Sequence, residues 1–325
     1  MKENKSVIIW LFSGCFLIFI MVVIGGVTRL TDSGLSMSTW KLIGGAPPLN
    51  LNEWIAAFDI YKATPEGKMN THYVLDDFKF IFFWEYVHRM MGRLLGVVFI
   101  IPFGYFLIKK KLSKKLIKQS CMLLILGASQ GLIGWWMVKS GLVDKPDVSH
   151  FRLAIHLITA FLTCAYTFWV ALDLLFPLSR EGNKTIFNHL LVLFILVITQ
   201  IIYGAFIAGL KAGRIYNTWP KMGDQWIPES VFLDPGAGYQ FIHRSLALII
   251  VAVTFYIWQK GKKTELSKLQ KKSFYILPVV VSLQTVLGIF TLIMSVPISL
   301  ALTHQILAFF LLLSLVLNLF LFKKS

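Results

Sequence analysis

Long apolar runs separated by short polar segments dominate the pattern of this chain. Each run holds about 20 apolar residues, enough for an α-helix to cross a hydrocarbon core of about 30 Å. A membrane-spanning β-strand would instead alternate over about ten residues. The pattern therefore predicts an all-α integral membrane protein with eight transmembrane helices, over residues 7–27, 78–108, 116–138, 151–176, 189–210, 239–258, 274–294 and 299–322.

Composition and charge agree with this interpretation. The 325 residues are 56% hydrophobic and 15% charged, too apolar for a disordered chain. The net charge of +16 could indicate a nucleic-acid partner, but the lysines gather in loops 109–118 and 260–272, and acidic residues gather in the opposite loops. Such an asymmetry of charge is typical of membrane proteins, whose cytoplasmic loops are rich in Lys and Arg, and it predicts that both termini are cytoplasmic. This distribution of charge also argues against a nucleic-acid partner. Because no Arg-rich leader of the mitochondrial kind is present, we expect a bacterial inner membrane.

The chain also repeats itself in the same order in both halves, which predicts a tandem parallel repeat. The expected halves are residues 1–176, with a long outer loop at 28–77 and an amphipathic stretch at 52–61, and residues 177–325. Each half would form one of two pseudo-symmetric four-helix bundles. The matching segments are Gly25–Trp40 with Gly204–Trp219, Trp84–Arg89 with Tyr239–Arg244, Ser129–Gly134 with Leu283–Gly288, and Ala154–Leu162 with Leu302–Phe310.

Four of the seven histidines lie inside spans, and they occupy paired positions of the repeat: His88 with His243, and His156 with His304. Each falls roughly 5 to 10 residues from the outer start of its span, about 8 to 15 Å inward, so all four lie in the outer half of the membrane. Ionisable residues at this depth indicate function, although a lone histidine could serve packing.

Two facing imidazoles in a four-helix unit can supply both axial ligands of a haem. A zinc site would want further carboxylate or cysteine ligands, and the spans of the second half offer none near His243 or His304. We therefore predict one haem pocket per half, with His88 and His156 binding one iron and His243 and His304 binding the other.

Arginines next to these histidines are candidates for binding haem propionates. Arg89 and Arg244 directly follow His88 and His243, and Arg152 lies one turn before His156. Arg29 lies at the outer end of the first span. Arginine suits bidentate contacts with carboxylates. The alternative is that these side chains only snorkel to the interface.

The two halves differ at one chemically important position. The repeat converts Glu85 of the first half to Gln240 of the second. Glu85 precedes His88 by three residues, so both side chains project from one face of the helix. A carboxylate there could move protons or stabilise positive charge, whereas an amide does not titrate. We therefore expect the reactive site in the first half, with Glu85 as its catalytic residue, although Glu85 could simply hydrogen-bond a histidine.

Three long segments of the chain resemble the haem A synthase family. They are Thr28–Asn50 (TRLTDSGLSMSTWKLIGGAPPLN), Phe78–Gly96 (FKFIFFWEYVHRMMGRLLG) and Ser129–Leu142 (SQGLIGWWMVKSGL). The resemblance is to the form of proteobacteria and mitochondria that lacks cysteines in the first outer loop. In agreement, Cys15, Cys121 and Cys164 all lie inside apolar spans, so no redox pair or disulfide is available outside the membrane.

The resemblance implies oxidation of the C8 methyl group of haem O to a formyl group through an alcohol, which yields haem A for cytochrome oxidase. It also implies that His88 and His156 serve the substrate haem, that His243 and His304 hold a haem b, and that Glu85 is the essential glutamate. Partners would be an electron-transfer protein of unknown identity, and haem O synthase or other cytochrome oxidase assembly proteins.

Three other functions remain as alternatives. A di-haem b-type electron carrier explains the four histidines but not the change from Glu85 to Gln240. A haem-binding or transport protein would bind haem without changing it. A prenyltransferase that makes haem O is disfavoured, because it would need Asp-rich motifs for Mg-diphosphate, and the spans contain only Asp173.

Overall fold

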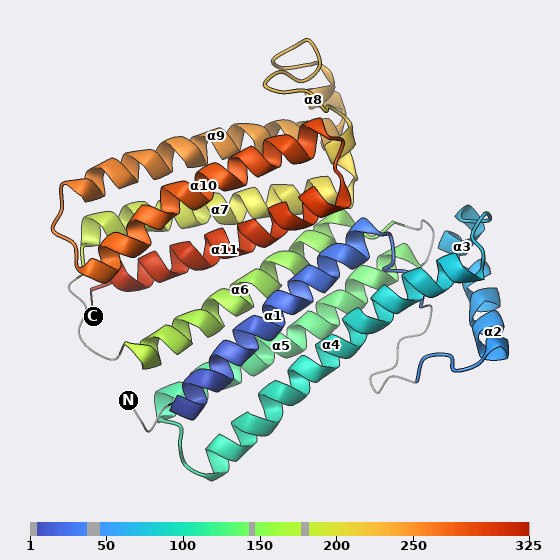
Figure 1. Cartoon of the computed structure of the whole chain (residues 1–325), viewed down its shortest axis with the longest axis horizontal. Helices are drawn as coiled ribbons and strands as arrows, with labels where there is room; N and C mark the ends of the chain where they lie inside the picture. Colours follow the sequence, from blue (N-terminus) through green and yellow to red (C-terminus); the bar gives the residue numbers. More distant parts are fainter. Residues whose placement is uncertain (1–4, 38–45, 143–146, 177–181, 325) are drawn as a thin grey trace. The chain divides into compact units, whose positions relative to one another are not determined.

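The eight predicted spans are confirmed as long helices. The computed structural model describes residues 5–37, 46–142, 147–176 and 182–324. Among these residues, eight helices are long and apolar enough to cross a membrane, and no strand occurs. They are α1 (Lys5–Leu30), α4 (Leu75–Ile108), α5 (Lys114–Gly141), α6 (His150–Leu175), α7 (Lys184–Gly209), α9 (Pro235–Lys262), α10 (Lys268–Ile293) and α11 (Ile298–Phe322) (Figure 1).

The connections between these helices carry short elements of their own. They are α2 (Leu51–Lys62), α3 (Pro65–Met69), the 3-10 turn η1 (Ala212–Arg214) and α8 (Ser230–Leu233). The amphipathic stretch expected at 52–61 falls within α2 and is confirmed. The matched Trp40 and the rest of segment 38–45 lie outside the described residues.

An aromatic cluster holds α2 against the first turns of α4. The ring of Trp54 packs edge-on against Phe82 at 5.2 Å, and Tyr61 packs against Phe78 at the same distance. Burial raises the pKa of Tyr61 to about 12, so its phenol stays neutral and accepts a hydrogen bond from Asn70 Nδ2 at 3.1 Å. Helix α2 is therefore anchored to the helix that carries His88.

By packing, the chain divides into two compact units, residues 16–160 and residues 1–15 with 161–325. In the latter unit, α9 packs against α7 and α10, and α11 packs against α10 and α7. In the former, α4 packs against α5. This division cuts through α1 and α6, so the expected boundary at residues 176 and 177 and the pseudo-symmetry of the bundles stay predictions.

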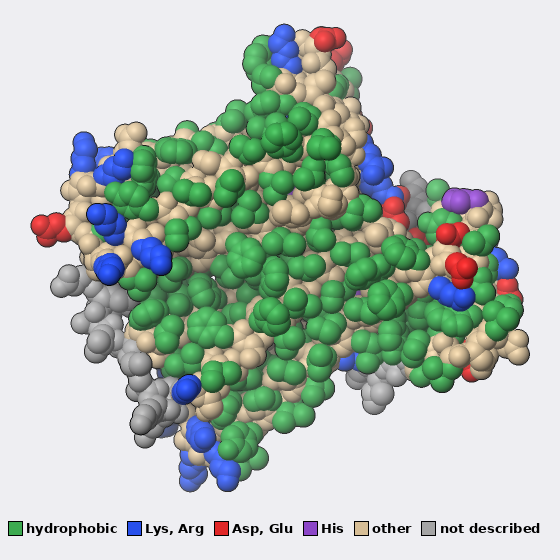
Figure 2. All heavy atoms as spheres, viewed as in Figure 1, with side chains coloured by type: hydrophobic (Ala, Val, Ile, Leu, Met, Phe, Trp, Pro, Cys, Tyr) green, Lys and Arg blue, Asp and Glu red, His purple; other side chains and the backbone are tan. Residues whose placement is uncertain are grey.

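The outward faces of the helices are apolar. Hydrophobic side chains cover the sides of the helices in Figure 2, and Lys and Arg side chains gather over the α4–α5 and α9–α10 connections. Ile101 of α4 and Leu132 of α5 keep 66% and 68% of their surface exposed. Contiguous apolar surface of this kind is unfavourable in water and suits lipid. The chain is thus a multi-pass membrane protein.

Candidate functional site

Each of the four intramembrane histidines lies against a glycine of a neighbouring helix. The contacts pair α1 with α4, α5 with α6, α7 with α9, and α10 with α11. A methyl group added to each glycine would lie close to the Cε1 atom of the facing histidine. The distances are 3.1 Å for Gly25 and His88, and 3.3 Å for Gly134 and His156. They are 3.2 Å for Gly204 and His243, and 2.8 Å for Gly288 and His304. Any larger residue would push the imidazole away, so the glycines seat the rings.

The histidines of the second half have the spacing that a shared iron requires. The ring centroids of His243 and His304 are 6.4 Å apart, and the ring planes are inclined by 71°. Two imidazoles on opposite sides of one metal ion, each with a metal–nitrogen bond of about 2.0 Å, would have centroids about 6.3 Å apart. The pair therefore fits a bis-histidine haem.

The histidines of the first half also have the chemistry of ligands. The buried Nδ1 atoms of His88 and His156 have no hydrogen-bond partner. Buried polar atoms are normally paired, so an unpaired imidazole nitrogen is typical of a site that takes a ligand. The donor set of this half fits a haem iron as well, while the assignment of these residues as iron ligands stays a prediction.

Glu85 is buried in a network of three hydrogen-bond donors. The residue is 3% exposed. Its Oε2 atom accepts hydrogen bonds from Ser36 Oγ at 2.6 Å and from Met37 N at 2.9 Å. Oε1 accepts from Arg89 Nη2 at 2.5 Å, and the same nitrogen donates to Met37 O at 3.0 Å. Three donors on two neighbouring segments therefore fix the position of the Glu85 carboxylate.

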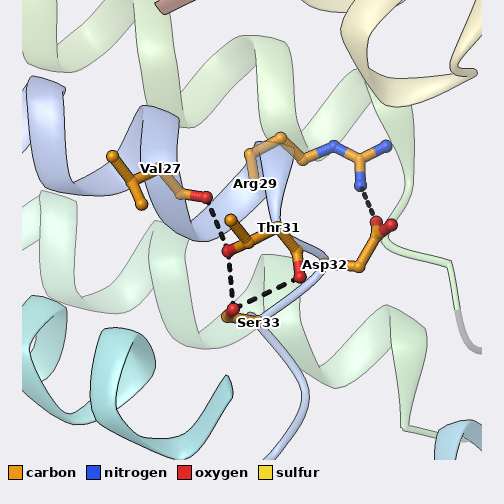
Figure 3. A network of polar contacts seen from close by, with 5 residues as sticks. All are labelled: Val27, Arg29, Thr31, Asp32 and Ser33. Carbon is orange, nitrogen blue, oxygen red and sulfur yellow. Dashed lines mark hydrogen bonds and ion pairs between the residues drawn. The ribbon is translucent and has the colours of Figure 1, made fainter. Parts of the chain in front are cut away.

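The end of α1 directs the chain toward this carboxylate. Thr31 Oγ1 donates to Val27 O at 2.8 Å and lies 2.6 Å from Ser33 Oγ, which also contacts Thr31 O at 3.3 Å (Figure 3). Arg29 Nη1 pairs with Asp32 Oδ1 at 3.2 Å. The polar residues between the glycine seat and Ser36 thus hold the turn that brings Ser36 and Met37 to Glu85.

Gln240 is the repeat counterpart of Glu85, and it donates a hydrogen bond to its loop where Glu85 accepts one. Its Nε2 donates to Tyr216 O at 3.0 Å and lies 3.5 Å from Gly213 O, while its buried Oε1 has no partner. Tyr216 is the repeat counterpart of Met37. The same loop position therefore offers an N–H to Glu85 and a C=O to Gln240, so each side chain suits its own loop.

Two of the four candidate propionate-binding arginines, Arg89 and Arg244, bind loop backbone. Arg89 binds Glu85 and the carbonyl of Met37. Arg244 donates to the carbonyls of Thr218 and, at 3.4 Å, Lys221. Arg152 donates to Trp136 O at 2.7 Å and stacks over the same indole. The roles predicted for Arg89 and Arg244 in haem binding stay predictions.

The sequence comparison found the repeat glycines but not their role as seats. Gly25 and Gly204, and Gly134 and Gly288, were already matched by the repeat. A glycine that recurs at a constant distance from a recurring histidine is the signal that could have revealed the contact, because only the packed helices show which ring it faces.

Comparison with known proteins places the chain in a family. Residues 8–316 match the family described as cytochrome oxidase assembly protein. The chain is 52% identical to the Heme A synthase of Flavobacterium johnsoniae, with 96% of each chain covered. It is 49% identical to that of Flavobacterium psychrophilum over 100% of each chain, and 43% identical to that of Nitrosospira multiformis over 93% of this chain and 89% of the relative. The resemblance seen in the sequence is confirmed, and the chain belongs to the cytochrome oxidase assembly protein family, whose relatives named above are called Heme A synthase.

Proposed function

We propose that this protein is a haem A synthase, an oxidoreductase that converts the C8 methyl group of haem O to a formyl group through an alcohol. Its relatives carry that name over the full chain. The observation that carries the proposal is the difference between Glu85 and Gln240 beside otherwise matching histidine seats. A protein that only carries electrons or stores haem has no need for that difference.

In this proposal the two halves have separate tasks. Residues 1–176 bind haem O between His88 and His156, and residues 177–325 hold a haem b between His243 and His304. A bis-histidine haem supplies one-electron transfer when bound. Arg89 and Arg244 add positive charge at the outer side, where the propionates of an outward-facing haem would lie.

Glu85 would provide the acid–base chemistry of the first half. Oxidation of the alcohol to the aldehyde releases two protons and two electrons, and the electrons pass to the electron acceptor. A carboxylate held by Ser36, Met37 and Arg89 keeps a fixed position, and it can accept a proton or stabilise a developing positive charge. Gln240 can do neither, which is why we assign the reaction to the first half.

The proposed setting is a bacterial inner membrane with both termini in the cytoplasm and both haem sites in the outer half. Basic α4–α5 and α9–α10 connections support this orientation. The partners would be an electron acceptor, and haem O synthase or oxidase assembly proteins that deliver the substrate or receive the product.

The test is the identity of the extracted haems. Protein made in a host that supplies haem O is purified, and its haems are separated and weighed by mass spectrometry for wild type, Glu85→Ala, Gln240→Ala and His243→Ala. Haem A or its alcohol precursor is expected in wild type and Gln240→Ala, and it should disappear in Glu85→Ala while haem B remains. If wild type yields only haem B and unaltered haem O, the protein is an electron carrier or a haem-binding protein instead.

A further inference from the structure

A glutamine stands four residues before three of the four glycine seats. Gln130 precedes Gly134, Gln200 precedes Gly204, and Gln284 precedes Gly288. Residues four apart lie on one face of a helix, so each glutamine faces the same neighbour as its glycine. The fourth position, before Gly25, is Met21.

In the second half these glutamines bond the ligand helices at the level of the histidines. Gln200 Nε2 donates to His243 O at 3.0 Å, and His243 Nδ1 lies 3.2 Å from Gln200 O. Gln284 Nε2 donates to His304 O at 3.1 Å. A helical carbonyl has a second lone pair for such a bond, so α7 is joined to α9 and α10 to α11 without loss of helix hydrogen bonds.

The first half has neither bond. Met21 carries no donor, and its Cε lies 3.8 Å from the place where a methyl group on Gly92 would stand. Gln130 Nε2 is buried and donates to no partner. The seats themselves are alike, since Gly25 approaches His88 as closely as Gly204 approaches His243. The two pockets thus differ in their interhelical bonds.

We propose that Gln200 and Gln284 lock the ligand helices around a resident haem, and that Met21 together with the unpaired Gln130 leaves the first pocket open to haem exchange. This inference rests on the proposed function, in which the first pocket must admit a substrate and release a product at every turnover. Haem release requires the ligand helices to separate, and an interhelical side-chain hydrogen bond opposes that separation. The glutamines act as positioning residues.

Reciprocal variants test the proposal on the full-length protein. Met21→Gln places a donor opposite the His88 carbonyl, and Gln200→Met removes one from the second pocket. Wild type and variants, loaded with haem O and haem B, are mixed with an excess of a haem-free globin, and each remaining haem is quantified over time by extraction and mass. His88→Ala and His243→Ala assign each kinetic phase to its pocket.

Met21→Gln should slow release from the first pocket, and Gln200→Met should speed release from the second, each roughly threefold to tenfold, as expected for one interhelical hydrogen bond in a membrane. Gln270→Met is the control at the other ends of α10 and α11, where Gln270 Nε2 donates to Leu321 O at 3.0 Å and Gln270 Oε1 accepts from Ser267 N at 2.9 Å. It should leave both rates unchanged. Gln284→Met gives a second measure if Gln200→Met does not fold.

Two results would overturn the inference. One is release from the first pocket of Met21→Gln at the wild-type rate. The other is equal acceleration in Gln200→Met and Gln270→Met, which would reveal general loosening. Neither depends on product formation: if wild type makes no haem A, the proposed function fails while the release rates of the two pockets are still measured.

Discussion

The two histidine pockets of this protein share a scaffold and differ in what surrounds it. In both halves each imidazole rests on a glycine of the neighbouring helix. The first pocket adds the buried carboxylate of Glu85, while the second has Gln240 and two glutamine bonds to the ligand helices. Under the proposed function, the two halves keep the same histidine–glycine contacts and differ in chemistry through a few neighbouring positions.

The polarity of the loop that covers each position matches the side chain found there. At Met37 the loop presents an N–H to Glu85, whereas at Tyr216 it presents a C=O to Gln240. An ionised carboxylate only accepts hydrogen bonds. If a glutamate replaced Gln240 and the loop stayed the same, its carboxylate would face the carbonyl oxygen of Tyr216, which is also an acceptor. The identity of residues 85 and 240 is thus tied to the loop conformations.

The largest effect should come from removing one ligand of each pocket. His243→Ala takes away half of the proposed iron ligation in the second half, so its haem B content should fall by more than about tenfold. His88→Ala should keep haem B and lose bound haem O. Pyridine haemochrome spectra together with extracted masses measure both. Equal loss of haem B in the two variants would mean that the pockets are not separate sites.

The next effect is expected from exchanging the polar partners. Glu85→Gln should abolish haem A formation while haem B is retained, since the amide carries no charge and does not titrate. Gln240→Glu should not create a second reactive site. It should lower thermal stability by about 2 kcal/mol, because its carboxylate would face the carbonyls of Tyr216 and Gly213. Product mass and a thermal melt check the pair, and haem A at the wild-type level in Glu85→Gln would remove Glu85 from the chemistry.

How far the sequence predicted these features depends on the range of the interaction. The eight spans, the four histidines and the Glu85 position follow from local hydropathy and from the repeat, both of which are written along the chain. The amphipathic helix at 52–61 has the same origin. These features need no knowledge of which helices touch.

The side-chain contacts between helices could not be predicted from the sequence. The sequence placed Ser36 forty-nine residues from Glu85 and did not indicate that its hydroxyl binds the carboxylate. Likewise the sequence did not predict that Gln200 and Gln284 donate to the backbone carbonyls of His243 and His304. Every residue has a backbone carbonyl, so the residue type does not indicate such an acceptor. Arg89 was assigned to a propionate from charge alone, and its contact with the Met37 carbonyl depends on the folded loop.

A smaller effect should follow from filling the tightest seat. Gly288→Ala would bring a methyl group to 2.8 Å from His304 Cε1, so ring or helix must shift and haem B content should fall several-fold. Gly134→Ala, at 3.3 Å from His156 Cε1, should disturb the first pocket less. Gly131→Ala is the control, since nothing lies within 4 Å of its added methyl group. That variant should be as stable as wild type or slightly more stable, by about 1 kcal/mol, because alanine favours helix.

If Gly131→Ala lowered haem B content as much as Gly288→Ala, the effect would belong to the helices in general rather than to the seat. Haem content per protein, measured beside a thermal melt, separates the two. A seat effect changes haem content more than it changes stability, whereas a general packing defect changes both together.

The smallest effect is expected from replacing the three cysteines, which lie one each in α1, α5 and α6. Cys15 Sγ and Cys164 Sγ lie 4.0 Å and 3.8 Å from each other's backbone carbonyl oxygens, weak contacts that pack α1 on α6. Cys121 is exposed on α5. Replacing all three by alanine should therefore change haem A formation by less than about twofold, with a modest loss of stability. Loss of haem A with haem B retained would instead mean that a thiol contributes to the reaction, and the contrast between Glu85 and Gln240 would no longer account for the chemical difference between the halves.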